Sequence, residues 1–253
     1  MHHAARSTRH APSLQDLGHP VTHPDPDDII ELRSFGRRHG RKLSARQTGL
    51  LEHLLPTLTL NLDAPVPEAL TSLYPPGARE VWLEIGFGGG EHLLWQAQHN
   101  PNVGLIGCEP FEEGVVKVLT GIEDNHRANI RLWPDDGRAV LRWLPPASIA
   151  RAFVLFPDPW PKKKHQKRRL LSAATLTMIA RVLKPGGTLR IGTDIPDYVR
   201  TIFMALAEVP QLHWTARSAA DWRHRPSDWP QTRYEQKAHR EGRTSCFLQF
   251  ERV

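Results

Sequence analysis

Short apolar runs alternate with amphipathic stretches from about residue 80 to the end of the chain. The apolar runs are rich in Val, Ile, Leu and aromatic residues and end in Gly, Pro or an acid, which is typical of buried strands. Between them, apolar residues recur every three or four positions, as in amphipathic helices. The runs that predict strands are 79–87, 102–110, 129–136, 148–159, 187–194, 212–217 and 245–253. The stretches that predict helices are 91–100, 111–125, 137–145, 168–184 and 196–209.

Strands that alternate with helices predict an α/β fold with right-handed crossovers and a mostly parallel, doubly wound sheet. In such a sheet, ligands bind beyond the carboxyl ends of the strands, so the loops that follow the strands are where chemistry is expected. Local signals agree with this assignment. Ser44 and Gln47 form a capping-box pattern before a helix over 48–55, and Pro185-Gly186-Gly187 predicts the end of the helix at 168–184.

The N-terminal part has a different composition. Residues 1–28 carry His, Pro and Asp without a periodic apolar face, which predicts a disordered tail. Residues 29–60 are interpreted as a basic arm and an N-terminal helix that packs on the core, and residues 61–253 as the main α/β domain.

Composition narrows the function classes. A net charge of +6 and a pI near 9.6 favour a polyanionic partner. Cys108 and Cys246 lie far apart, so neither a disulfide framework nor a Cys-x-x-Cys metal site is predicted, and no metal is expected. No secretory signal is evident, and no apolar run approaches the ~20 residues of a membrane span. We therefore expect a cytoplasmic protein without a membrane partner.

The first candidate site is the loop LEIGFGGGEH after the first predicted strand. Gly86 and Gly88 allow a tight turn in which backbone approaches a ligand closely. Glu91 stands where the third glycine of GxGxxG would be, so the loop indicates a nucleotide-type ligand without separating a nicotinamide from S-adenosylmethionine.

Acidic residues sharpen this prediction. Glu109 ends the second strand, where a carboxylate can accept both hydroxyls of a ribose. Asp136 follows the third strand and is placed to reach an adenine amino group, with Asp135 as a rival for that role. Glu84 lies inside the first strand, where an unpaired charge is costly to bury, so we expect it to face the ligand or to hold the glycine loop.

The fourth strand leads into FPDPWPKKKHQKRRLL, a rigid acidic loop followed by a dense basic block. Prolines on both sides of Asp158 fix the direction of its carboxylate. The basic block is either a solvated face without a partner or a surface that meets an anion beside a chemical site.

Four segments, LEIGFGGGEHL, FPDPWPKKKHQKRRL, IGTDIPDY and TRYEQKAHREG, occur in this order. Together they resemble the bacterial tRNA (guanine-N7)-methyltransferase family, over residues 33–253. The resemblance implies a Rossmann-like class I methyltransferase fold: a seven-stranded, mostly parallel sheet with helices on both faces and an antiparallel last strand. It also implies methyl transfer from S-adenosyl-L-methionine, which becomes S-adenosyl-L-homocysteine, to N7 of a guanosine in the tRNA variable loop.

The resemblance also assigns roles to residues. Asp158 would be catalytic. Cofactor-binding residues would be Glu84, Gly86, Gly88, Glu109, Asp136 and Asp158. Substrate-binding residues would be Lys162, Asp194, Thr232, Arg233, Tyr234 and Glu235, with Asp194 or Glu235 gripping the guanine edge. The position of the basic block, directly after the loop of Asp158, adds that phosphates of the tRNA would meet Lys164, Lys167, Arg168 and Arg169.

Two rival functions remain at this point. A nicotinamide-dependent oxidoreductase would use the glycine loop and Glu109, but it leaves the basic block unexplained. An RNA-binding protein on a methyltransferase scaffold, without turnover, explains the charge but not the acids of a cofactor site. The sequence is compatible with a monomer or a homodimer.

Overall fold

The computed structural model describes residues 38, 40 and 42–253, which belong to one compact unit, Arg33–Val253. The predicted tail at 1–28 and most of the predicted basic arm lie outside the described residues. The division into arm, N-terminal helix and domain therefore stays a prediction.

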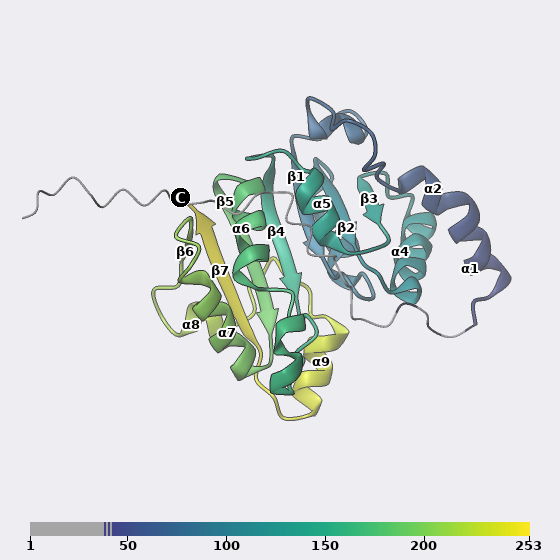
Figure 1. Ribbon diagram of the computed structural model, residues 1–253. Coiled ribbons are helices and arrows are strands. Elements are labelled where there is room, and N and C mark those ends of the chain that lie inside the picture. Colours follow the sequence, from purple (N-terminus) through teal and green to yellow (C-terminus); the bar gives the residue numbers. More distant parts are fainter. Residues whose placement is uncertain (1–37, 39, 41) are drawn as a thin grey trace, which may run out of the picture. The chain divides into compact units, whose positions relative to one another are not determined.

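The described residues form a seven-stranded sheet in the order β3-β2-β1-β4-β5-β7-β6 (Figure 1). The pairs among β1 to β5 are parallel, whereas β7 runs antiparallel between β5 and β6. The mostly parallel sheet and the antiparallel last strand that the sequence predicted are therefore confirmed. The strands are β1 (Glu80–Ile85), β2 (Val103–Cys108), β3 (Ile130–Trp133), β4 (Ile149–Leu155), β5 (Leu183–Thr193), β6 (Leu212–Trp214) and β7 (Cys246–Arg252).

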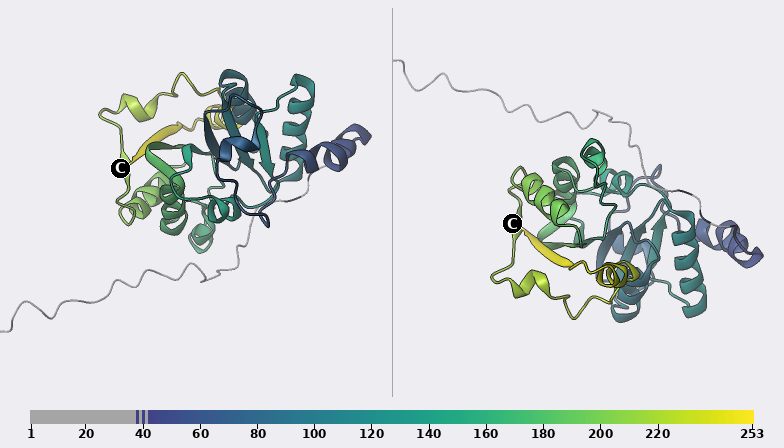
Figure 2. Two further views of the ribbon diagram at one scale, coloured as in Figure 1. Left: turned by 90° about the horizontal axis from the view of Figure 1, so that it is seen from above. Right: turned by 90° about the horizontal axis from the view of Figure 1, so that it is seen from below.

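Helices cover both faces of this sheet (Figure 2). Successive strand residues point to opposite faces. Accordingly, Leu83 of β1 belongs to a core with residues of α5, α6 and α7, whereas Trp82 belongs to a core with residues of α3 and α4. The helices are α1 (Ala45–Gly49), α2 (Leu55–Leu58), α3 (Glu91–His99), α4 (Glu112–Asn125), α5 (Gly137–Trp143), α6 (Ala173–Val182), α7 (Pro196–Leu206), α8 (Ala220–Arg223) and α9 (Arg233–Arg240). Shorter elements are the π-helical turn η1 (Leu50–Leu54) and the 3₁₀ turns η2 (Leu70–Leu73) and η3 (Lys163–Arg168).

The N-terminal helix begins as predicted. The Ser44 side chain accepts a hydrogen bond from the Gln47 backbone, and the Gln47 side chain accepts one from the Ser44 backbone. These reciprocal bonds satisfy two of the backbone donors that a helix start leaves without intrahelical partners.

The long helix predicted over 168–184 is wrong at both ends. Its first part is separate, because η3 ends at Arg168 and Ser172 then caps α6 through a hydrogen bond from the Thr175 backbone. Its last part belongs to β5, which starts at Leu183 and continues through Gly186, where φ is +75°. The Pro-Gly-Gly segment therefore lies at a register shift within the β4–β5 pairing rather than at a helix end.

Within residues 42–253, the helices fall short of the length and apolar character that a lipid bilayer demands of a spanning segment. The same part of the chain holds no group of three or more His, Cys, Asp or Glu residues arranged for a metal ion.

Candidate functional site

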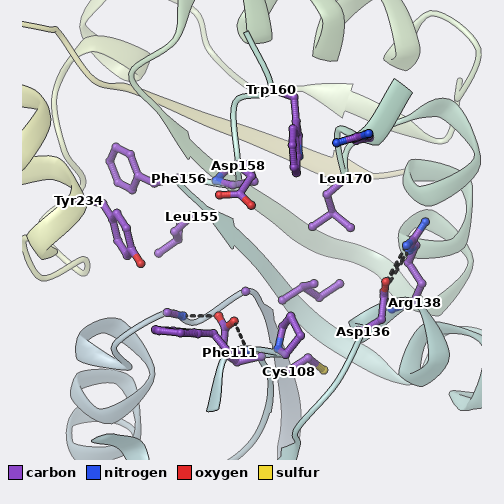
Figure 3. A pocket seen from close by; sticks show the side chains of 18 residues that line it. Cys108, Phe111, Asp136, Arg138, Leu155, Phe156, Asp158, Trp160, Leu170 and Tyr234 are labelled. Atoms are coloured by element: carbon purple, nitrogen blue, oxygen red, sulfur yellow. Dashed lines mark hydrogen bonds and ion pairs between the residues drawn. The ribbon is translucent and has the colours of Figure 1, made fainter. Parts of the chain in front are cut away.

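A cavity of about 340 Å³ opens at the carboxyl ends of β1 to β4 (Figure 3). This is the edge where an open α/β sheet binds its ligands. Sequence-predicted residues that line the cavity are Gly86, Gly88, Glu109, Asp136, Asp158, Arg168 and Tyr234. The fold therefore brings together residues that lie up to about 150 positions apart in the chain.

The glycine loop adopts the conformation that its composition predicted. Gly86 and Gly88 have φ angles of +76° and +55°, a region that residues with a Cβ rarely occupy. A Cβ on Gly86 would meet no atom within 4 Å, and a Cβ on Gly88 would lie 2.8 Å from the Tyr234 ring. The loop thus leaves open space at Gly86 and lets Tyr234 approach the backbone at Gly88.

Glu109 holds the glycine loop from the end of β2. Its Oε2 accepts a 2.7 Å hydrogen bond from the Gly88 N–H, and its Oε1 accepts one of 2.9 Å from the Phe111 N–H. Burial raises the pKa of this carboxyl, and the two backbone hydrogen bonds oppose that shift. A carboxylate oxygen has more than one acceptor direction, so both oxygens keep acceptor capacity toward the cavity.

The structure separates the two candidate adenine ligands. Asp136 caps α5 by accepting a 2.9 Å hydrogen bond from the Arg138 backbone, pairs with the Arg138 guanidinium at 2.6 Å, and lines the cavity. Asp135 is not part of the cavity lining and pairs with Arg38 at 3.0 Å. This placement favours Asp136.

Glu84 is buried and does not line the main cavity. Its Oε2 lies 2.7 Å from Nδ1 of His92, and Nε2 of His92 lies 3.0 Å from the Gln96 amide. That amide also donates a 2.8 Å hydrogen bond to the Asp228 carbonyl. Glu84 therefore joins the β1 end to α3 and to the segment before α9. His92 and Gln96 gave no signal in the sequence, because a helical His beside apolar residues has no motif.

Asp158 stands on a strained loop at the cavity mouth. Phe156 and Trp160, on either side of the Pro-Asp-Pro turn, have φ angles of +51° and +41°. Left-handed conformations of bulky residues cost free energy and tend to occur at functional sites. Asp158 is exposed, but partial desolvation still raises the pKa of its carboxyl.

The basic block divides into two groups. Lys162, Lys164 and Lys167 are exposed, and Arg168 lies 5.0 Å from the Trp160 ring centre while it lines the cavity. Arg169, in contrast, is a correction to the sequence prediction, because only 3% of its side chain is exposed.

The guanidinium of Arg169 is fully engaged inside the protein. It donates to the Pro159 carbonyl at 2.9 Å and pairs with the Asp197 carboxylate at 2.6 Å. It also donates to the Thr201 hydroxyl and lies 4.8 Å from the Tyr198 ring centre. A phosphate cannot reach it without breaking these contacts.

The Thr-Arg-Tyr-Glu segment also divides. Thr232 caps α9 by accepting a hydrogen bond from the Glu235 backbone, and the buried Glu235 side chain pairs with Arg225 at 3.2 Å. Arg233 pairs with Glu91, and Tyr234 alone of the four lines the main cavity.

Asp194 lies outside that cavity too, and its carboxylate pairs with Arg243 at 2.5 Å. Neither Asp194 nor Glu235 lines this cavity, and an arginine pairs with each carboxylate, so the guanine grip expected of one of them stays a prediction.

Comparisons with known proteins agree with this geometry. A family model described as "Putative methyltransferase" matches residues 78–248. A tRNA (guanine-N(7)-)-methyltransferase from Chelativorans sp. (strain BNC1) is 48% identical over 219 residues, which cover 87% of this chain and 94% of the relative. One from Rhizobium meliloti (strain 1021) is 49% identical over the same shares. The chain belongs to the tRNA (guanine-N(7)-)-methyltransferase family. The family and the enzyme class expected from the four motifs are confirmed, and neither rival function is favoured.

Solved structures support the fold. The 16S rRNA methyltransferase KamB aligns with a TM-score of 0.53 at 16% identity, over 73% of this chain and 93% of that one. An antibiotic-related methyltransferase aligns with a TM-score of 0.52 at 15% identity, over 77% and 95%. At these identities the likeness shows the fold, which is that of class I methyltransferases.

The cavity fits the cofactor that this family and fold imply, S-adenosylmethionine. It offers open space at Gly86, a buried carboxylate with free acceptor directions at Glu109, and an acid beside an arginine at Asp136. These are the donor and acceptor types that a ribose diol and an adenine require.

Proposed function

We propose that this protein methylates N7 of a guanosine in the tRNA variable loop, with S-adenosylmethionine as the methyl donor. The observation that carries the proposal is the convergence of Glu109, Asp136 and Asp158 from three strand ends on one cavity, in a chain of this family. Since tRNA is the proposed substrate, we expect the protein to act in the cytoplasm.

We assign the cofactor to the floor of the cavity. Glu109 would accept the ribose hydroxyls, Asp136 would meet the adenine edge, and the turn at Gly86 and Gly88 would lie against the methionine part. Glu84 would act indirectly, since its carboxylate contacts His92 of α3, the helix that follows the glycine loop. When bound, S-adenosylmethionine supplies an electrophilic methyl group on a sulfonium.

The protein's contribution to the reaction is alignment and electrostatics. Guanine N7 has an in-plane lone pair, so no general base is needed, and positioning of N7 is the main source of rate. Positive charge develops on the base as N7 is methylated. Asp158 is our choice for the carboxylate that stabilises it, since it lines the cavity mouth and is partly desolvated there.

Aromatic side chains frame the place where the base would lie. Figure 3 shows Asp158 between Tyr234 and Trp160, with Phe156 beside Tyr234. A base taken out of its stack is usually held between such side chains. We therefore assign guanine to the space beside Asp158.

The basic block without Arg169 would receive the tRNA backbone. Lys162, Lys164, Lys167 and Arg168 follow directly after Trp160, where a strand must pass if it presents one base to Asp158. Contacts of this kind position a nucleic acid without reading its sequence.

The decisive experiment is methyl transfer to unmodified tRNA followed by mass spectrometry of its nucleosides. We expect 7-methylguanosine from the wild-type protein and a loss of at least 100-fold in single-turnover rate for Asp158→Ala, on the scale reported for lost electrostatic stabilisation. Met204→Leu, at an exposed position of α7 outside the cavity lining, is the control for a harmless change. Absence of 7-methylguanosine with the wild type would overturn the proposed function.

A further inference from the structure

Helix α9 presents a basic face to solvent. Thr232, Glu235 and Ala238, spaced three residues apart, are buried and dock the helix on the protein. The residues between them are exposed, and Arg233, Lys237 and Arg240 follow the four-then-three spacing that places side chains along one stripe.

This stripe contains two charges without an ion pair to a described residue, although Lys237 and Arg240 both lie near Glu241, whose carboxylate pairs with Arg243. Arg233 is neutralised by Glu91. Neither Lys237 nor Arg240 forms an ion pair or a side-chain hydrogen bond with any residue that the structure describes. A cation near a helix C-terminus does interact favourably with the helix dipole, so the charges alone do not identify a ligand. Their position relative to the cavity does.

The stripe starts at the cavity mouth, on the opposite side from η3, which carries exposed lysines of the basic block. The first turn of α9 supplies Tyr234 to the cavity lining, η3 supplies Arg168, and the chain just before η3 supplies Trp160. Tyr234 and Trp160 flank Asp158 (Figure 3). Exposed basic side chains therefore lie on both sides of the cavity mouth, those of η3 on one side and those of α9 on the other.

We propose that the exposed face of α9, through Lys237 and Arg240, is a second phosphate-binding surface for the tRNA. The inference rests on the proposed function. An RNA strand that presents one base to Asp158 must enter and leave the cavity mouth. A basic surface at η3 alone would bind the RNA backbone on one side of that base only. With a basic surface on each side of the mouth, the RNA backbone is bound on both sides of the target base, which fixes that base over the cavity.

The test is the salt dependence of tRNA binding, measured by fluorescence anisotropy with labelled unmodified tRNA. The variant is Lys237→Gln with Arg240→Gln. Loss of two phosphate contacts should lower the slope of log affinity against log salt by about 1.4–1.8. Between 50 and 200 mM salt, the variant should then lose about 7- to 12-fold less affinity than the wild type does.

Two matched variants separate phosphate binding from helix stability. Lys237→Arg with Arg240→Lys keeps both charges and should restore the wild-type slope. Arg142→Gln with Lys184→Gln removes one Arg and one Lys near the amino ends of the strands, and should leave the slope unchanged. Melting temperatures of all variants report any effect on the helix itself.

The failure of this inference is distinct from failure of the proposed function. If the wild type makes 7-methylguanosine and the glutamine variant keeps the wild-type slope, α9 is a solvated face and the inference is wrong. If the glutamine variant loses slope only in proportion to a lowered melting temperature, and the charge-keeping variant behaves likewise, the charges stabilise the helix and the inference is also wrong. If the wild type makes no 7-methylguanosine, the proposed function is wrong, whatever the slope.

Discussion

Nε of Arg169 donates a 2.9 Å hydrogen bond to the carbonyl oxygen of Pro159, the residue that follows Asp158. The same guanidinium pairs with Asp197 of α7, so it fastens the loop after β4 to a helix. The other end of that loop is held by the Phe156 N–H, which donates a 2.7 Å bond to the Gly192 carbonyl of β5. Asp158 is thus carried by a short turn anchored on both sides.

Substitution of Arg169 should therefore affect stability, whereas substitution of its lysine neighbours should affect tRNA binding. Arg169→Ala leaves the Pro159 carbonyl without its donor, and we expect a loss of about 1–3 kcal/mol in the free energy of unfolding. The methylation rate should also fall, while the salt slope of tRNA binding stays constant. Thermal or denaturant unfolding and anisotropy titrations measure the two effects.

The matched control is Lys164→Ala with Lys167→Ala. It should leave unfolding unchanged and lower the salt slope by up to about 1.4–1.8. Arg169→Lys should recover only part of the stability, since an ammonium lacks the planar fork that reaches several acceptors at once. A lower salt slope for Arg169→Ala, without a change in stability, would show that Arg169 contacts phosphates and does not anchor the loop.

Glu109 should combine two roles in one side chain. Glu109→Ala removes acceptors from the N–H groups of Gly88 and Phe111, so the free energy of unfolding should fall. It also removes the proposed ribose acceptor, which should weaken S-adenosylmethionine binding by about 1.5–3 kcal/mol, the range for hydrogen bonds to charged groups. Calorimetry with the cofactor and circular dichroism measure both. Glu208→Ala is the control, because Glu208 is exposed and does not line the cavity, and it should bind the cofactor as the wild type does. Wild-type affinity in a folded Glu109→Ala protein would remove Glu109 from the cofactor site.

The raised pKa of Asp158 predicts the acid side of the pH–rate profile. Its carboxylate must be ionised to stabilise positive charge, so the single-turnover rate should fall with decreasing pH at a higher pH than an ordinary Asp would give. In Asp158→Asn the rate should be low and this acid limb should be absent. If the rates of the wild type and of Asp158→Asn fell at the same acid pH, a group other than Asp158 would control the acid side of the profile.

The same shift has a consequence for stability. Because the folded-state pKa is raised, the favourable contribution of Asp158 is present below its unfolded pKa and is lost as pH rises through the folded one. Relative to the wild type, Asp158→Asn should therefore be equally or more stable at neutral pH, and this advantage should disappear in acid. A melting-temperature series against pH measures it.

Tyr234 and Glu235 are neighbours in sequence with opposite surroundings. Tyr234 is 44% exposed at the cavity mouth, so Tyr234→Ala should lower the methylation rate with little change in melting temperature. Glu235 is 3% exposed and pairs with Arg225, so Glu235→Ala should cost about 1–3 kcal/mol of unfolding free energy. Single-turnover rates and denaturant unfolding of the two variants make the comparison. An active, fully stable Glu235→Ala protein would contradict the structural role assigned here, and an unimpaired Tyr234→Ala protein would remove Tyr234 from the site.

The sequence by itself determined the order of the seven strands and the edge of the sheet that carries chemistry. Both depend on local patterns: buried strands read as apolar runs, helices repeat their apolar residues with a period near 3.6, and Ser44 caps its helix through residues three positions away. Gly86, Gly88, Glu109, Asp136 and Asp158 follow strand ends, so the topology alone brought them to one cavity.

Only the tertiary structure decided which charged residues face a ligand. Arg169 and Lys167 belong to one basic run, yet Arg169 is buried because Asp197 lies 28 positions further along the chain. Asp135 and Asp136 are adjacent, and a pairing with Arg38, 97 positions away, distinguishes them. The helix predicted over 168–184 ends early for the same reason: the pairing of Leu183 with Ile149 of β4 overrides local helical spacing. Burial and ion pairing depend on partners remote in sequence, and a local pattern carries no information about them.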